Sequence, residues 1–108
     1  MTNQEAFTTV VLHLRKQGRP ARIGSDCRYR APDGCKCAIG VLIPDDQYSP
    51  KLEGSNVLAL IHLPALQDLN PKMLYDLQNT HDLYDPKEWE KRFEYHAEKY
   101  NLEVPKHD

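Results

Sequence analysis

Three cysteines occupy one short segment of the chain, at positions 27, 35 and 37. Thiolates of this kind, with one histidine, could form a tetrahedral Cys3His zinc site. The ligands of that site would be Cys27, Cys35, Cys37 and His81. The cysteine spacing lacks the paired Cys-x2-Cys units of most zinc modules. If Cys35 were not a ligand, a second histidine would be needed to complete the four zinc ligands. Buried free thiols that pack as small hydrophobic groups are the simpler interpretation. We therefore expect no cofactor and keep zinc as the alternative.

The second chemistry that these residues could support is nucleophilic catalysis. Cys37 directly precedes an apolar segment that could be helical, and backbone N–H groups at a helix start lower the pKa of a thiol. His81, followed by Asp82, could act as a base, although the orienting acid is seldom the adjacent residue. No glycine-rich oxyanion loop or cysteine-protease signature accompanies the pair. Enzyme activity through Cys37 and His81 is therefore the alternative function, and we favour a protein without catalytic activity.

Basic side chains gather in residues 15–36, which hold seven Lys or Arg and two acidic residues, whereas residues 37–108 hold seven basic and thirteen acidic residues. Such polarity can steer an anionic partner toward one end of a molecule. Arginines on a turn, with a tyrosine for stacking, could bind phosphates and a base. The sequence pI of about 6.2 is low for a nucleic-acid-binding protein. Arg30 could instead pair with Asp45 or Asp82. The candidate binding surface comprises Arg22, Arg28, Tyr29, Arg30 and Lys36.

A family resemblance rests on the same segment and on two later dipeptides. The residues are Cys27-x-Tyr29-Arg30, Gly34-x-x-Cys37-Ala38-Ile39-Gly40-x-Leu42-Ile43-Pro44-Asp45, Leu77-Gln78 and His81-Asp82. The pattern resembles a family of small uncharacterised proteins found in phages and proteobacterial genomes, over the chain from the first helix to about Tyr84. Cys35 falls at a position that we expect to be variable in that family. The resemblance implies a phage or mobile-element origin and an action on a host process or a defence system, and it implies no mechanism.

The elements that must position these residues begin with a helix over residues 2–17. Thr2 and Glu5 have the spacing of a capping box, and Gly18 suits the left-handed position that ends a helix. From residue 19 onward, proline and glycine interrupt the helical pattern. The sequence Ala31-Pro32-Asp33-Gly34 favours a tight turn. We therefore predict a short β-hairpin over residues 27–38.

Apolar residues 37–43 could be a buried strand or a short helix, because Val, Ile and Leu suit both. The remaining chain reads as helical segments separated by Pro64 and by the dipeptides Asn70-Pro71 and Asp85-Pro86, in which Asn or Asp caps a helix and proline occupies its first position. The first segment covers residues 57–63 and continues after Pro64 over 65–69. The helix after Asn70-Pro71 carries Leu74, Leu77, His81 and Tyr84 on one face, and the last helix carries Trp89, Phe93, Ala97 and Tyr100 along one side.

The predicted fold class is thus mainly α, or α+β, with four or five helices and the hairpin at 27–38 packed against them. Residues 1–102 should form a single domain, and residues 103–108 a flexible C-terminal tail. No apolar run approaches the roughly 20 residues that cross a bilayer, and no secretory signal is visible. We therefore expect a cytoplasmic location and no membrane partner.

The function that we expect is that of a small non-enzymatic binding or regulatory protein that contacts a host macromolecule. A composition of 40% hydrophobic and 28% charged residues is ordinary for a globular domain. A host protein is the favoured partner, and nucleic acid or another anion could bind through residues 15–36. In a phage-encoded protein the cytoplasm would be that of the host cell.

Overall fold

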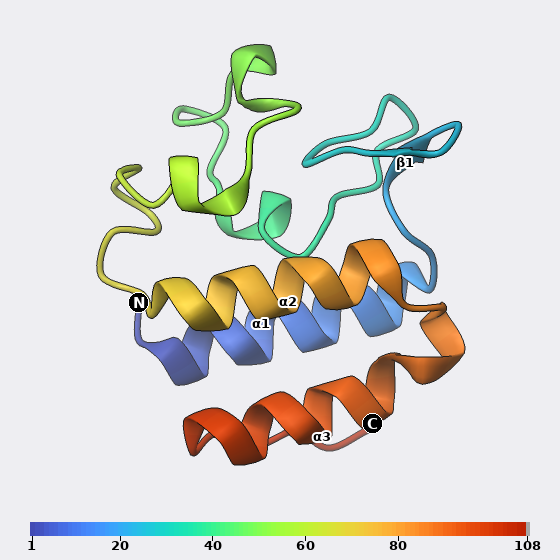
Figure 1. Cartoon of the computed structure of the whole chain (residues 1–108), viewed down its shortest axis with the longest axis vertical. Coiled ribbons are helices and arrows are strands. Elements are labelled where there is room, and N and C mark those ends of the chain that lie inside the picture. Colours follow the sequence, from blue (N-terminus) through green and yellow to red (C-terminus); the bar gives the residue numbers. More distant parts are fainter. Residues whose placement is uncertain (108) are drawn as a thin grey trace.

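The computed structural model describes residues 1–107, which form three α-helices, four short 3₁₀ helices and one two-stranded hairpin. The α-helices are α1 (Asn3–Gln17), α2 (Pro71–Leu83) and α3 (Trp89–Tyr100). Helix α2 packs against α3, while the long irregular region between α1 and α2 covers the other side of α2 (Figure 1). No helix in this part of the chain is long and apolar enough to span a membrane.

Helix α1 follows the predicted boundaries because its ends are specified locally. The Thr2 hydroxyl accepts a hydrogen bond from the Glu5 amide at 3.1 Å, and the Glu5 carboxylate accepts one from the Thr2 amide at 2.8 Å. Gly18 ends the helix with φ 69°, a left-handed conformation that favours glycine. The face between these caps is buried against the core, and its residues are Ala6, Phe7, Val10, Val11 and Leu14.

The expected four or five helices are a wrong count within the described residues, because the segment 57–69 is not α-helical. It contains the 3₁₀ helix η3 (Val57–Ala59) and a series of turns. An apolar residue occurs here at every third position: Val57, Leu60, Leu63, Leu66 and Leu69. The backbone amide of each of these leucines donates a hydrogen bond to the carbonyl of the apolar residue three positions before it. A spacing of three matches a 3₁₀ rather than an α-helical period, and Pro64 lacks the amide that an α-helix needs.

The hairpin lies earlier in the chain than predicted. Strand β1 (Arg22–Ile23) pairs with β2 (Asp26–Cys27), so the strands end where the predicted hairpin began. At residues 27–38 the expected turn is present, since the Gly34 amide donates to the Ala31 carbonyl at 3.1 Å. Only one isolated β-bridge, Arg30 with Lys36, flanks that turn.

A side chain from a distant segment explains why pairing stops there. The amides of Tyr29 and Arg30 donate to the two carboxylate oxygens of Glu53, at 2.8 and 3.1 Å. Those two amides are therefore unavailable to a neighbouring strand. The pairing around the turn is limited to the Arg30–Lys36 bridge, in which the Cys37 amide donates to the Tyr29 carbonyl and the Ala31 amide to the Cys35 carbonyl.

Residues 37–43, for which strand and helix were both open, contain the 3₁₀ helix η1 (Gly40–Leu42). A Cβ atom at Gly40 would lie 1.9 Å from the Tyr29 carbonyl oxygen, so only glycine permits this approach of the two segments. Leu42 and Ile43 are buried. The segment thus joins the core through its backbone as well as through its side chains.

The C-terminal residues 103–107 follow α3 without regular structure and contact α1. The Glu103 amide donates to the Gln4 side chain at 2.8 Å, whose Nε2 donates back to the Glu103 carbonyl at 2.9 Å. Arg15 donates to the Pro105 carbonyl at 2.7 Å. The flexibility of this tail stays a prediction, and Asp108 lies outside the described residues.

Candidate functional site

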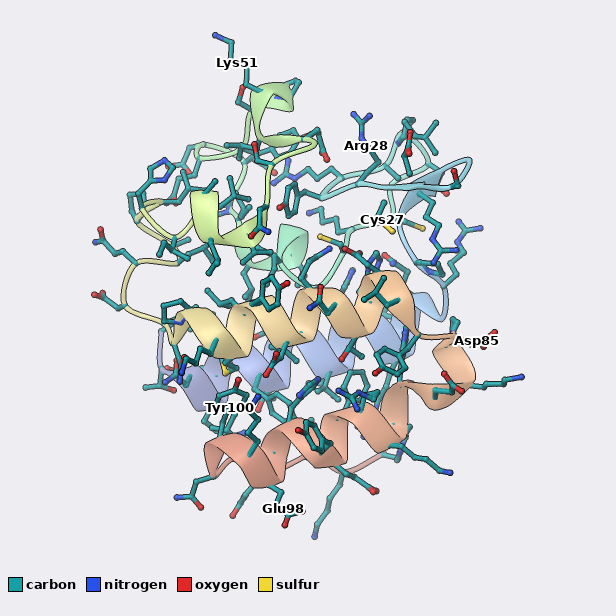
Figure 2. The ribbon with its side chains drawn as sticks, viewed as in Figure 1. Cys27, Arg28, Lys51, Asp85, Glu98 and Tyr100 are labelled. Carbon is teal, nitrogen blue, oxygen red and sulfur yellow. The ribbon has the colours of Figure 1, made fainter. Side chains whose placement is uncertain are left out.

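A polar pocket of about 220 Å³ lies between three parts of the chain that are far apart in sequence. One wall is the segment that leaves the hairpin, the opposite wall is the loop after η2 (Pro50–Leu52), and the floor is α2. In Figure 2, Cys27 lies low on the hairpin side, close to α2, and Arg28 points away from the helices. The lining residues are Cys27, Arg28, Tyr29, Gly54, Ser55, Asn56, Val57, Tyr75, Gln78, Asn79 and Asp82.

The floor of the pocket contains a carboxylate, Asp82, that organises two neighbouring side chains. Its Oδ1 accepts hydrogen bonds from Gln78 Nε2 at 2.8 Å and from His81 Nδ1 at 2.6 Å. Gln78 and His81 are both buried, whereas Asp82 is partly exposed toward the pocket. Helix geometry allows this, because residues 78 and 82 lie one turn apart on the same face.

The same two side chains hold the loops against α2. His81 Nε2 accepts a hydrogen bond from the Ala21 amide at 2.9 Å, and Gln78 Oε1 accepts one from the Ile39 amide at 3.2 Å. Because a backbone amide can only donate, Nε2 of His81 must present its lone pair and Nδ1 must carry the proton given to Asp82. The predicted signature Leu77-Gln78 and His81-Asp82 therefore acts as a clamp on the hairpin segment and on the chain before η1.

The donor set for zinc does not assemble as the sequence suggested. Among residues 1–107, the only cluster with metal-ligand character is Cys27, His81 and Asp82, whose ligand atoms lie within 4.8 Å of one another. If a metal bound Nδ1 of His81, the ring proton would move to Nε2. Nε2 would then face the Ala21 amide with a proton, although it now accepts a hydrogen bond from that amide. His81 therefore has no lone pair to offer.

Cys35 and Cys37 are engaged elsewhere. Arg19 Nε donates to the Cys35 sulfur at 3.2 Å, and the Gly40 amide donates to the Cys37 sulfur at 3.1 Å. Both thiols are buried, which matches the expectation that they pack as small hydrophobic groups. The zinc alternative gains no support from this arrangement.

Cys37 also lacks the environment of a nucleophile. Its side chain is fully buried, and this burial raises the pKa of the thiol to about 12 despite the hydrogen bond from the Gly40 amide. Since a thiol of this pKa carries no appreciable thiolate at neutral pH, attack on a substrate is not favoured. His81, the predicted base, has both ring nitrogens engaged. The geometry gives the alternative of a Cys37 and His81 enzyme no support.

Cys27 is the cysteine that faces the pocket. Partial burial raises the pKa of its thiol, a hydrogen bond with Arg22 lowers it, and the Asp82 carboxylate, to which the thiol donates, raises it again. The net direction is upward, so the group is a neutral thiol at physiological pH. It contributes a weak hydrogen-bonding surface rather than an anionic sulfur.

Glu53 is the residue that sequence analysis missed. Its carboxylate accepts from the amides of Tyr29 and Arg30 and from the Tyr48 hydroxyl at 2.6 Å, and it pairs with Arg28 at 3.5 Å. The side chain is only 7% exposed. It fixes the spacing between the two walls of the pocket. Nothing local in the sequence distinguishes Glu53 from the other acidic residues of the C-terminal two thirds.

The predicted basic surface is largely neutralised in the fold. Arg28 pairs with Glu53, and Arg30 pairs with Asp45 at 2.8 Å, donates to the Ile43 carbonyl and lies over the Tyr48 ring. Arg30 therefore has the structural role that the sequence left open.

Three predicted surface residues remain. Arg22 is exposed and donates to the Asp82 carbonyl at 3.3 Å, and Lys36 is partly exposed. Tyr29 is 6% exposed and donates its hydroxyl proton to the Ser55 carbonyl, so its ring is not available for stacking. The fold thus brings Cys27, Arg28, Tyr29, Gln78 and Asp82 to one pocket and leaves Arg22, Arg30 and Lys36 outside it.

Comparison with protein-family models, with curated proteins and with solved structures finds no match for this chain. The resemblance to the phage-associated family therefore stays a prediction. Function has to be inferred from the site itself.

Proposed function

We propose that the protein is a non-catalytic binding protein whose polar pocket is the contact site for a partner protein. The observation that carries the proposal is the composition of the pocket: hydrogen-bonding side chains from three distant segments converge on it, while the groups that could perform catalysis are buried or paired. Neutral donors and acceptors, together with Arg28 and the partly exposed Asp82 carboxylate, suit a polar segment of another protein.

The rim supplies features common in protein interfaces. Tyr75 of α2 is 40% exposed and lines the pocket. An exposed tyrosine beside a polar centre provides apolar contact area, and tyrosine is enriched in protein interfaces. The resemblance to a phage-associated family makes a host protein the partner that we propose, with inhibition of a host or defence process as the outcome.

The test is affinity capture from a lysate of the candidate host with the full chain immobilised. We would compare the wild type with Asn79→Arg, in which a long charged side chain enters the 220 Å³ pocket from a helical position that tolerates arginine. A matched control is Gln67→Arg, because Gln67 is exposed and does not line the pocket.

The expected result is a host protein retained by the wild type and by Gln67→Arg, and reduced at least about tenfold with Asn79→Arg, equivalent to about 1.4 kcal/mol of binding free energy. Circular dichroism would establish that both variants are folded. Equal retention by all three proteins would show that the pocket is not the contact site, and the proposal would then be abandoned.

A further inference from the structure

A second surface feature lies just beyond the C-terminal end of α2, where η4 (Pro86–Glu88) leads into α3. It is a shallow depression of about 560 Å³ near the turn at which Asp85 is labelled in Figure 2. The lining residues are Tyr84, Lys87, Glu88, Lys91 and Arg92. None of them lines the polar pocket, so a ligand site in this depression would be independent of the proposed function.

Arg92 is held in this depression by aromatic rings rather than by a carboxylate. Its guanidinium carbon lies 4.5 Å from the centre of the Tyr84 ring and 4.6 Å from that of the Tyr95 ring. Its Nε is buried and has no hydrogen-bond partner in the described chain. A guanidinium stacked on rings keeps its N–H bonds in its own plane. Because the Nε of Arg92 is buried, an acceptor that approaches from the edge would meet the terminal N–H groups of the guanidinium.

The basic side chains of this depression have no acidic partner in the described residues, unlike those of the hairpin region. Arg28 and Arg30 each pair with a carboxylate. By contrast, within residues 1–107 no carboxylate lies within ion-pair distance, 4.0 Å, of Lys87, Lys91 or Arg92, including that of Glu88 in the same depression. In this described part of the chain, the basic side chains that form ion pairs are Arg15, Arg19, Arg28, Arg30, His81, Lys99 and His107.

We propose that this depression binds one compact oxyanion, a phosphate or carboxylate group of a ligand. The planar edge of Arg92 can form the paired N–H···O contacts that both groups accept, and Lys87 and Lys91 add mobile positive charge. A polyanion such as nucleic acid fits less well, because exposed Glu94 and Glu98 continue along α3 and would repel it.

The experiment is a titration of the full chain with inorganic phosphate, with acetate as a second arm, at low ionic strength and with sodium chloride matched in ionic strength as the reference. The readout is the side-chain Nε–Hε resonance of Arg92 in ¹⁵N-edited NMR spectra. Saturable shifts of this signal with a millimolar Kd are expected. The relative Kd of the two arms distinguishes a phosphoryl from a carboxylate ligand.

Three variants make the outcome decisive. Lys87→Ala combined with Lys91→Ala should weaken phosphate binding at least fivefold, and Glu88→Gln should tighten it about twofold, because removal of the nearby negative charge favours the anion. The exposed Lys72→Ala on α2 is the matched control and should leave Kd unchanged. All these positions are exposed, so folding should be retained. Absence of a saturable shift at Arg92, or the same Kd in the double variant as in the wild type, would overturn the proposal.

Discussion

The Nδ1 atom of His81 lies 2.6 Å from an oxygen of Asp82, its neighbour in the chain, and the same oxygen accepts a hydrogen bond from Gln78. A pair of adjacent residues that resembled a catalytic base and its acid is instead the centre of a buried clamp. Its outer ends hold the amides of Ala21 and Ile39, which belong to the two segments that flank the cysteine-rich turn. The clamp therefore stabilises the wall and the floor of the polar pocket together.

Replacement of His81 by alanine should destabilise the fold by about 3 kcal/mol. The substitution leaves a cavity beside Trp89, which stacks on the ring at 6.1 Å, and leaves the Ala21 amide without a partner. Urea unfolding followed by circular dichroism would measure the change. His62→Ala, at an exposed position, should change the free energy of unfolding by less than about 0.5 kcal/mol. Similar values for the two variants would contradict the clamp.

Gly40→Ala should cost at least about 3 kcal/mol or prevent folding, because its Cβ would lie 1.9 Å from the Tyr29 carbonyl oxygen. Gly24→Ala is the matched comparison: Gly24 has φ 60°, but nothing lies within 4 Å of its added Cβ, so only about 1 kcal/mol of backbone strain is expected. Thermal unfolding of both variants measures the difference. If Gly24→Ala were the more damaging of the two, the close approach of the segments would be wrong.

The parts of this fold that sequence analysis predicted are those with local causes. Thr2, Glu5 and Gly18 specify the ends of α1, and Asn70 with Pro71 specifies the start of α2, whose first amides donate to the Asn70 side chain. Each of these signals acts within four residues of its effect, so it can be recognised without knowledge of the tertiary structure.

The misplaced hairpin and the pocket that sequence analysis did not predict both depend on contacts between distant segments. Glu53 takes up the amides of Tyr29 and Arg30, and no local pattern shows that a carboxylate more than twenty positions away will end the hairpin. Cys27 and Asp82 meet in the pocket only because the chain folds back over α2. The 3₁₀ turns in residues 57–69 are different, since their period of three was visible in the leucine spacing and could have been recognised.

His96 should make stability pH-dependent. It is 1% exposed, and its Nδ1 has no hydrogen-bond partner among residues 1–107. Its pKa is lowered to about 4, chiefly by burial and also by the charges of Arg92 and Lys99, while Asp76 opposes the shift. Its Nε2 lies 2.7 Å from the Thr80 hydroxyl of α2. In the unfolded chain the pKa of histidine is about 6.5. Between pH 6.5 and 4 the unfolded chain therefore binds more protons, and stability falls as the pH is lowered.

The expected loss from this histidine between pH 7 and pH 5 is about 2 kcal/mol. Urea unfolding at the two pH values should show that loss in the wild type and a smaller one in His96→Gln, whose side chain does not titrate. His62→Gln, at an exposed position, should behave as the wild type. An identical pH dependence in His96→Gln and the wild type would exclude His96 as the cause.

The thiols of Cys27 and Cys37 should differ in reactivity because their surroundings differ. Cys27, which faces the pocket, should be alkylated first by iodoacetamide, slowly at pH 7 and faster above pH 9, because its pKa is raised but its sulfur is accessible. Cys37, buried with a pKa of about 12, should react only when the protein unfolds. Mass spectrometry of peptides after timed labelling resolves the sites, and labelling in urea supplies the control for complete reaction. Fast alkylation of Cys37 in the native protein at pH 7 would show that its thiol is a reactive nucleophile. That result would contradict the non-catalytic function that we propose.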